Sequence, residues 1–116
     1  MMRNQIWKKI PHLGPEPRSS HTSTLFQDYI ITYGGTAEGY KSVKSDIKVL
    51  NLKTCSFEDF SLEGDQPSKR EDHTACLFDT NKILVFGGYD VNEDLVLNDT
   101  VIISAFILQI IIFRHV

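Results

Sequence analysis

The stretch DHTACLFDTNKILVFGGYD (residues 72–90) contains an apolar run that stops at two consecutive glycines. β-Branched and large apolar residues at positions 83–86 favour a β-strand. Glycine weakens a strand, so Gly87 and Gly88 mark a place where the backbone must bend or approach another segment closely. We therefore expect a strand that ends in a sharp turn.

The same arrangement occurs earlier in the chain. PEPRSSHT (residues 15–22) and PSKREDHT (residues 67–74) share the pattern P-x-x-R-x-x-H-T, with each matched residue 52 positions apart. IITYGG (residues 30–35) lies over ILVFGG (residues 83–88) at an offset of 53, which one inserted residue near Asp79 explains. SDIKVL and NDTVII continue the match at that offset, so the sequence contains an internal repeat.

Each repeat unit reads as a set of short strands without helical periodicity. The first begins with small residues, the second is apolar on both faces, and an Asp introduces the third. In the first unit a tight turn, NLKT, leads to a more polar fourth strand over residues 55–60. A four-stranded unit of about 50 residues is typical of a β-propeller blade.

The chain resembles the kelch family of β-propellers in these features. The resemblance rests on the paired glycines, on the Arg and His before each first strand, and on the aromatic Trp7 and Phe57 of fourth-strand segments. The repeat signature is Arg18, His21, Gly34 and Gly35 in one unit and Arg70, His73, Gly87 and Gly88 in the other. The resemblance implies an all-β fold with two antiparallel four-stranded-type blades of an incomplete propeller, the second lacking a recognisable fourth strand.

The repeat divides the chain into four parts. Residues 12–60 form kelch repeat 1, and residues 61–104 form an incomplete kelch repeat 2. Residues 1–11 contain a segment that matches a fourth strand. The resemblance to the kelch family implies that this segment is a clasp strand, which completes the final blade of a propeller. Residues 105–116 form a divergent apolar tail, so we expect a truncated or altered C-terminus. Open blade faces and this tail predict self-association.

Composition narrows the classes of partner. The net charge of −3 over 116 residues offers no basic field for nucleic acid or for an anionic membrane surface. The apolar run over residues 101–113 is short for a membrane span, so a membrane anchor is not favoured.

Cys55 and Cys76 are too few for a disulfide scaffold and are expected to be buried thiols. No signal-peptide pattern is present at the N-terminus, which favours a cytoplasmic protein.

The repeated charged residues have a structural and a functional interpretation. His21 and His73 could form a metal pair, but equivalent residues of adjacent blades lie side by side, and structural hydrogen bonding is favoured. Arg18 and Arg70 could bind an acidic peptide, although internal pairing, with Glu71, Asp72 or backbone carbonyls, is favoured. We predict no metal and no cofactor.

The loops after the paired glycines are the better candidates for partner binding, because equivalent loops project from one face of a kelch propeller. The candidate residues are Tyr40, Lys41 and Lys44 in the first loop and Tyr89, Asp90, Glu93 and Asp94 in the second. Exposed Tyr and mixed charge suit a protein or peptide, and purely solvated loops are an equal alternative. The partner's identity does not follow from the sequence.

No catalytic constellation accompanies the repeat. We therefore expect a non-catalytic kelch module that mediates protein–protein interaction, as the resemblance implies. The alternatives are a fragment of a kelch-like propeller enzyme or enzyme modifier, and a truncated gene product without independent function.

Overall fold

The computed structural model describes residues 6–10, 14, 16–37, 42–43, 46–65, 67–106 and 109–115. Every regular element in this part of the chain is a β-strand, and the sheets are mainly antiparallel. None of the described residues forms a helix with the length and apolarity that crossing a bilayer requires. The predicted all-β class with partial propeller blades is confirmed.

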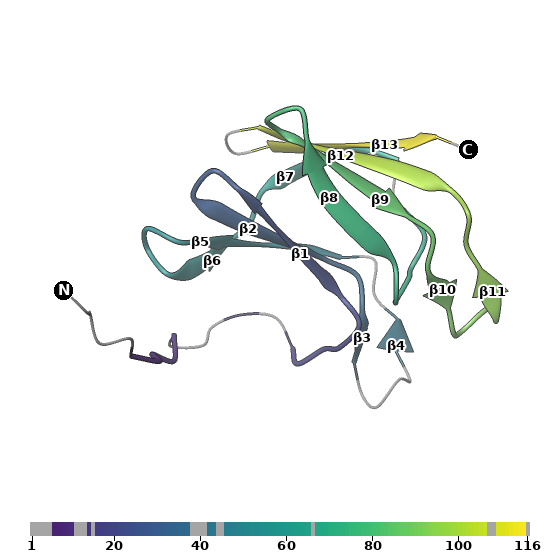
Figure 1. The fold of residues 1–116 in the computed structure, drawn as a ribbon, viewed down its shortest axis with the longest axis horizontal. Coiled ribbons are helices and arrows are strands. Elements are labelled where there is room, and N and C mark those ends of the chain that lie inside the picture. Colours follow the sequence, from purple (N-terminus) through teal and green to yellow (C-terminus); the bar gives the residue numbers. More distant parts are fainter. Residues whose placement is uncertain are drawn as a thin grey trace.

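The first sheet, called blade 1 here, is built in the order β1-β2-β5-β6. All its neighbours pair antiparallel. Short turns join β1 to β2 and β5 to β6, whereas residues 34–46 connect β2 to β5. Figure 1 shows this sheet lying beside the second one, with its strands in teal and blue. Its strands are β1 (Thr22–Phe26), β2 (Tyr29–Tyr33), β5 (Ile47–Asn51) and β6 (Ser56–Glu58).

The second sheet has the order β7-β13-β12-β9-β8. Its last four members repeat the arrangement of blade 1 and are called blade 2. β7 is an addition at the outer edge and runs parallel to β13. The strands are β7 (Ser61–Gly64), β8 (Thr74–Phe78), β9 (Lys82–Phe86), β12 (Thr100–Phe106) and β13 (Gln109–His115).

The prediction that the second repeat lacks a fourth strand is wrong. β13 pairs antiparallel with β12 over seven residue pairs and takes the position that β6 takes in blade 1. The tail carries neither the NLKT turn nor an aromatic fourth-strand motif, so it has no counterpart in the repeat. Its isoleucines still favour a strand, and Ile110 and Ile112 alternate into the core, with β7 covering part of the outer edge.

The N-terminal segment is extended but belongs to no sheet. Residues 6–10 form no strand, and the Trp7 side chain is 101% exposed. Figure 1 shows this segment running away from both sheets. That it completes a further blade therefore stays a prediction.

The hydrophobic core lies between the two blades. Phe26, Ile31, Tyr33 and Val49 of blade 1 pack against alternate residues of blade 2, which are Ile83, Val85, Val101, Ile103, Ala105, Ile110 and Ile112. Because successive side chains of a strand point to opposite faces, this alternation places one face of each sheet in the contact. The opposite faces point away from the core.

A two-stranded hairpin follows each pair of glycines. β3 (Thr36–Ala37) pairs with β4 (Ser42–Val43), and β10 (Tyr89–Asp90) pairs with β11 (Leu95–Val96). Figure 1 shows both hairpins at the same end of the two sheets.

Both cysteines are exposed free thiols, so the prediction that they are buried is wrong. Cys55 lies in the turn between β5 and β6 rather than in a strand. Cys76 lies in β8, on the face that points away from blade 1, where nothing among the described residues covers it.

Candidate functional site

A buried arginine clamp fixes the start of the β10–β11 hairpin. Arg70, which is fully buried, donates through Nη1 to the carbonyl of Gly87 at 3.0 Å. Its Nη1 and Nη2 also donate to Asp99 Oδ1 and Oδ2 at 2.9 and 3.0 Å, a bidentate pair. Burial would lower the pKa of Arg70, but the hydrogen bonds and charge of Asp99 outweigh it and hold the pKa above its ordinary value.

Blade 1 contains the same clamp in a more open setting. Arg18 donates to the Gly34 carbonyl at 3.0 Å and to the two oxygens of Asp46 at 2.7 and 3.0 Å. Partial burial would raise the pKa of Asp46, but hydrogen bonding and charge from Arg18, together with Lys48, hold it below its ordinary value.

The carboxylate partners of both arginines are the Asp residues that introduce the third strands. Asp46 and Asp99 are 53 positions apart and pair with Arg18 and Arg70, whereas Glu71 and Asp72 do not. The dipeptides SD and ND before the third strands, which by themselves indicate only turns, therefore also supply the carboxylate partners of the two arginines.

His73 joins the two blades. Its Nε2 lies 2.8 Å from the Thr22 hydroxyl, and its ring packs edge-on against Tyr33 at a centroid distance of 5.0 Å. Burial, and then the charge of Arg70, lowers the pKa of His73 to about 4, so the ring is neutral at pH 7. Burial likewise raises the pKa of Tyr33 to about 12, and its hydroxyl donates to the Ser68 carbonyl at 2.9 Å.

His21, the equivalent residue in blade 1, is exposed. The two histidines therefore occupy the same repeat position in different surroundings. Among the described residues there is no cluster of three or more His, Cys, Asp or Glu side chains arranged to hold a metal ion.

The β10–β11 hairpin holds the second set of predicted partner-binding residues. Tyr89 donates its hydroxyl to Asp94, which raises the pKa of Tyr89 above its ordinary value. Asp90 is buried, and its carboxylate accepts from the backbone amides of Asn92 and Glu93 at 3.0 and 3.3 Å. Asp90 therefore shapes the turn, while Glu93 and Asp94 are exposed.

Two apolar residues of this hairpin lie outside the set of candidates that the sequence predicts. Leu95 and Val96 in β11 are 53% and 78% exposed, beside the acidic turn. A signal was present, because an LVL run at positions 95–97 is an unusual composition for a solvated loop. The candidates Tyr40, Lys41 and Lys44 of the first loop lie outside the described residues.

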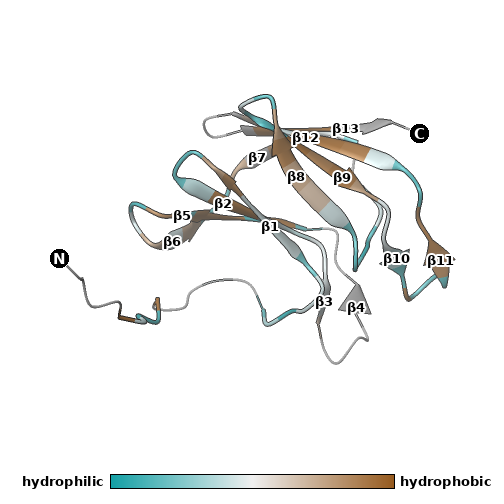
Figure 2. Ribbon diagram, viewed as in Figure 1, coloured by the Kyte–Doolittle hydropathy of each residue, from teal (hydrophilic) through white to brown (hydrophobic). Residues whose placement is uncertain are grey.

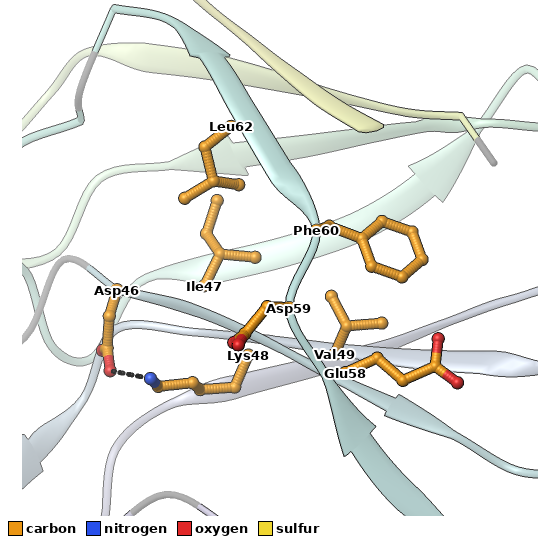
Figure 3. A pocket seen from close by; sticks show the side chains of 8 residues that line it. All are labelled: Asp46, Ile47, Lys48, Val49, Glu58, Asp59, Phe60 and Leu62. Atoms are coloured by element: carbon orange, nitrogen blue, oxygen red, sulfur yellow. Dashed lines mark ion pairs between the residues drawn. The ribbon is translucent and has the colours of Figure 1, made fainter. Parts of the chain in front are cut away.

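A pocket of about 320 Å³ lies along β5 and the segment that leads from β6 to β7. Figure 3 shows an ion pair between Asp46 and Lys48 at one side of it, with Ile47, Val49, Phe60 and Leu62 among the lining residues. Glu58, at the other side, accepts a hydrogen bond from the Asn51 amide at 2.7 Å. Asp46 and Glu58 are thus held by neighbouring groups, whereas Asp59, the third carboxylate of the lining, is exposed. The pocket lining includes no Ser, Cys or His nucleophile.

The fold and the duplicated clamp define a module built from repeated β-propeller blades, and comparison with known proteins gives the family. Residues 1–106 match the KLHDC2/KLHL20/DRC7 Kelch-repeats domain. The chain therefore belongs to the kelch-repeat family, whose members generally mediate protein interactions.

Three relatives show how varied the proteins carrying such repeats are. The chain is 32% identical over 101 residues to N-(sulfonatooxy)prop-2-enimidothioate sulfolyase of Thlaspi arvense, covering 82% of this chain and 29% of that protein. It is 29% identical to acyl-CoA-binding domain-containing protein 5 of Arabidopsis thaliana, over 71% of this chain and 13% of that protein. It is 32% identical to protein ral2 of Schizosaccharomyces pombe, over 73% of this chain and 15% of that protein. The chain thus spans less than a third of each relative.

Proposed function

We propose that this chain is a non-catalytic kelch module that binds a protein or peptide partner through the β10–β11 hairpin. The observation that carries the proposal is the exposure of Leu95 and Val96 on a hairpin whose backbone is held at its base. Exposed apolar residues beside polar ones are a feature of protein-binding surfaces.

The hairpin is rigid enough to recognise a partner without a large loss of entropy. Arg70 holds the Gly87 carbonyl at its start, and Glu71 exchanges two backbone hydrogen bonds of 2.9 Å with Tyr89. The Asp90 carboxylate closes the turn. A preorganised surface binds more tightly than a flexible loop with the same side chains.

The chemistry of the hairpin favours an extended peptide with an apolar residue beside basic ones. Leu95 and Val96 provide apolar contact, and Glu93 and Asp94 provide negative charge nearby. Exposed charge of this kind contributes to specificity and association rate. We further propose that the protein is cytoplasmic, binds no nucleic acid and associates with itself.

The enzymatic alternative has one specific support, the sulfolyase relative. Of the three carboxylates that line the pocket, Asp46 and Glu58 are engaged by Arg18, Lys48 and Asn51, which leaves these two poorly placed for proton transfer. The third, Asp59, is exposed to solvent. The engagement of Asp46 and Glu58 supports the non-catalytic proposal.

The test is to select peptides from a random phage-displayed library on the immobilised chain and to measure binding by biolayer interferometry. We expect selected peptides to contain an apolar residue flanked by Lys or Arg. Val96→Asp should weaken their binding about tenfold or more, since Val96 is exposed and its replacement leaves the fold intact. Leu52→Asp, at an exposed apolar residue in the β5–β6 turn, is the control and should have no effect. Peptides that bind the Val96→Asp chain unchanged would contradict the proposal.

A further inference from the structure

The face of blade 2 that points away from blade 1 is an exposed apolar surface. It is called the outer face, and its apolar residues in β8, β9 and β12 are Cys76, Phe78, Leu84, Phe86 and Ile102. Thr74, Lys82 and Thr100 lie on the same face at its margins. The register places Cys76 opposite Leu84 and Leu84 opposite Ile102, so these side chains share one side of the sheet. Figure 2 shows hydrophobic residues along all three strands. Phe78 and Phe86 are 39% and 52% exposed.

Blade 1 shows what such a face does in this fold. Phe26 and Tyr33 occupy the repeat positions of Phe78 and Phe86 and are only 3% and 2% exposed, because blade 2 covers them. The outer face of blade 2 therefore repeats a surface that already holds a blade within the same molecule.

The space beside the equivalent glycines Gly34 and Gly87 also shows that the outer face of blade 2 is uncovered. Gly34 and Gly87 have φ of 70° and 69°, a left-handed conformation that favours glycine. A Cβ on Gly34 would lie 2.7 Å from both the Arg70 carbonyl oxygen and a carbon of the His73 ring. A Cβ on Gly87 would meet only the Leu97 oxygen, at 3.4 Å. The space that blade 2 fills beside Gly34 is open beside Gly87.

We propose that a second copy of this chain docks its blade 1 on the outer face of blade 2, head to tail, and repeats the internal blade–blade contact. The occupant is a second copy because its blade 1 carries residues equivalent to those by which blade 2 contacts blade 1 within the molecule. His21 stands at the position of His73, Arg18 at that of Arg70 and Ser20 at that of Asp72. This proposal rests on the self-association proposed above and assigns its geometry.

Each polar contact between blade 1 and blade 2 within the molecule has an equivalent pair of residues in the proposed contact between two copies. Within the molecule, Thr22 bonds to the His73 ring, the Gly35 amide donates to the Arg70 carbonyl at 2.9 Å, and the Asp72 amide donates to the Ser20 carbonyl at 3.1 Å. Between copies, the corresponding pairs are the Thr74 hydroxyl with His21, the Gly88 amide with the Arg18 carbonyl, and the Ser20 amide with the Asp72 carbonyl. The backbone is already formed for them, since Ser20 and Asp72 have φ of 58° and 56°.

The contact between copies is weaker than the internal one for two reasons. Phe86 lacks the hydroxyl through which Tyr33 donates to the Ser68 carbonyl. The approaching face of blade 1 also carries Ser23, Thr32 and Lys48 where blade 2 has Ala75, Val85 and Val101. We therefore expect an association that depends on protein concentration. Head-to-tail contacts form a closed ring when the rotation between copies closes. A propeller has about four to eight blades, and each copy contributes two, so we expect a ring of about two to four chains.

The experiment is sedimentation equilibrium with native mass spectrometry on the full 116-residue chain over a range of concentrations. Phe86→Asp should weaken association about thirtyfold or more, as a central apolar contact does. Phe86→Tyr supplies the hydroxyl present at Tyr33, with the Glu16 carbonyl of the second copy as its acceptor, and should strengthen association about three- to tenfold. His21→Ala should weaken it, and the hairpin variant Val96→Asp should leave it unchanged.

Each other result overturns the head-to-tail contact. A chain that stays monomeric at every concentration, or a Phe86→Asp chain that still associates, rules out the outer face. A dimer that Phe86→Asp dissociates but that neither Phe86→Tyr nor His21→Ala alters would be a symmetric contact between two outer faces. Peptides that bind the β10–β11 hairpin should bind these variants as they bind the parent chain. A monomeric chain that still binds such peptides would therefore overturn only the head-to-tail contact.

Discussion

Arg70 and Arg18 connect the same three points of the backbone in the two blades. Each links the segment before a first strand, the first carbonyl of the glycine pair, and the Asp that introduces the third strand. A buried guanidinium needs this full set of partners, because removing one partner of a buried pair typically costs about 3–5 kcal/mol. The clamp thereby fixes the direction in which the hairpin leaves the sheet, and it connects a repeated residue pattern to the candidate binding surface.

His73 makes the blade–blade contact sensitive to pH. Its pKa is about 4 in the folded chain and about 6.5 when unfolded, so the unfolded state binds the proton first as pH falls. Stability is therefore fully present above pH 6.5 and is lost progressively down to about pH 4, by about 3 kcal/mol at most. His73→Gln should reduce this part of the pH dependence, measured as the free energy of unfolding in urea between pH 7 and pH 4.

The matched control for this prediction is His21→Gln. His21 is exposed and its charge makes only a small contribution to the lowered pKa of His73, so its replacement should change the pH dependence far less than His73→Gln does. An unchanged slope in the His73→Gln chain would assign the acid sensitivity to other groups.

β13 completes blade 2 with residues that have no counterpart in the repeat. Ile110 is fully buried against the blade–blade core, whereas Ile111, its neighbour on the opposite face, is half-buried. Ile110→Ala should lower the free energy of unfolding by about 2–5 kcal/mol, as cavity-forming substitutions in a core do. Ile111→Ala should cost clearly less, and both are measured by urea denaturation. Equal small losses would show that the tail is not packed as a fourth strand.

The structural features that the sequence predicts are those that occur in both repeat units. The strands equivalent in both units, the glycine turns and the internal use of Arg18 and Arg70 followed from matched positions. β13 did not, because residues 109–115 match nothing in the first repeat. It pairs with β12, the strand directly before it, and with β7, which is distant in sequence and lies beside it only once the sheet is formed. The partners Asp46 and Asp99 lie 28 and 29 residues from their arginines, so sheet register rather than local pattern brings them together.

Among the described residues, the buried apolar side chains form one core to which both blades contribute. Phe26, Ile31, Tyr33 and Val49 are buried only because the other sheet lies against them. In repeat proteins each unit is stabilised largely by its neighbour, so contacts between units decide whether they unfold together. Two blades with a single shared core are therefore expected to behave as one cooperative unit.

Tyr33 offers the sharpest test of that coupling, because it belongs to β2 but bonds to the Ser68 carbonyl and packs on His73. Tyr33→Ala should destabilise the chain by about 3–5 kcal/mol, as loss of a buried aromatic ring does. Hydrogen exchange followed by mass spectrometry should then show equal loss of protection in β2 of blade 1 and β9 of blade 2. Phe57→Ala, at the exposed edge of blade 1, should affect only nearby amides. If β9 keeps its protection while β2 loses it in the Tyr33→Ala chain, the blades are separate folding units, because a shared core cannot open on one side alone.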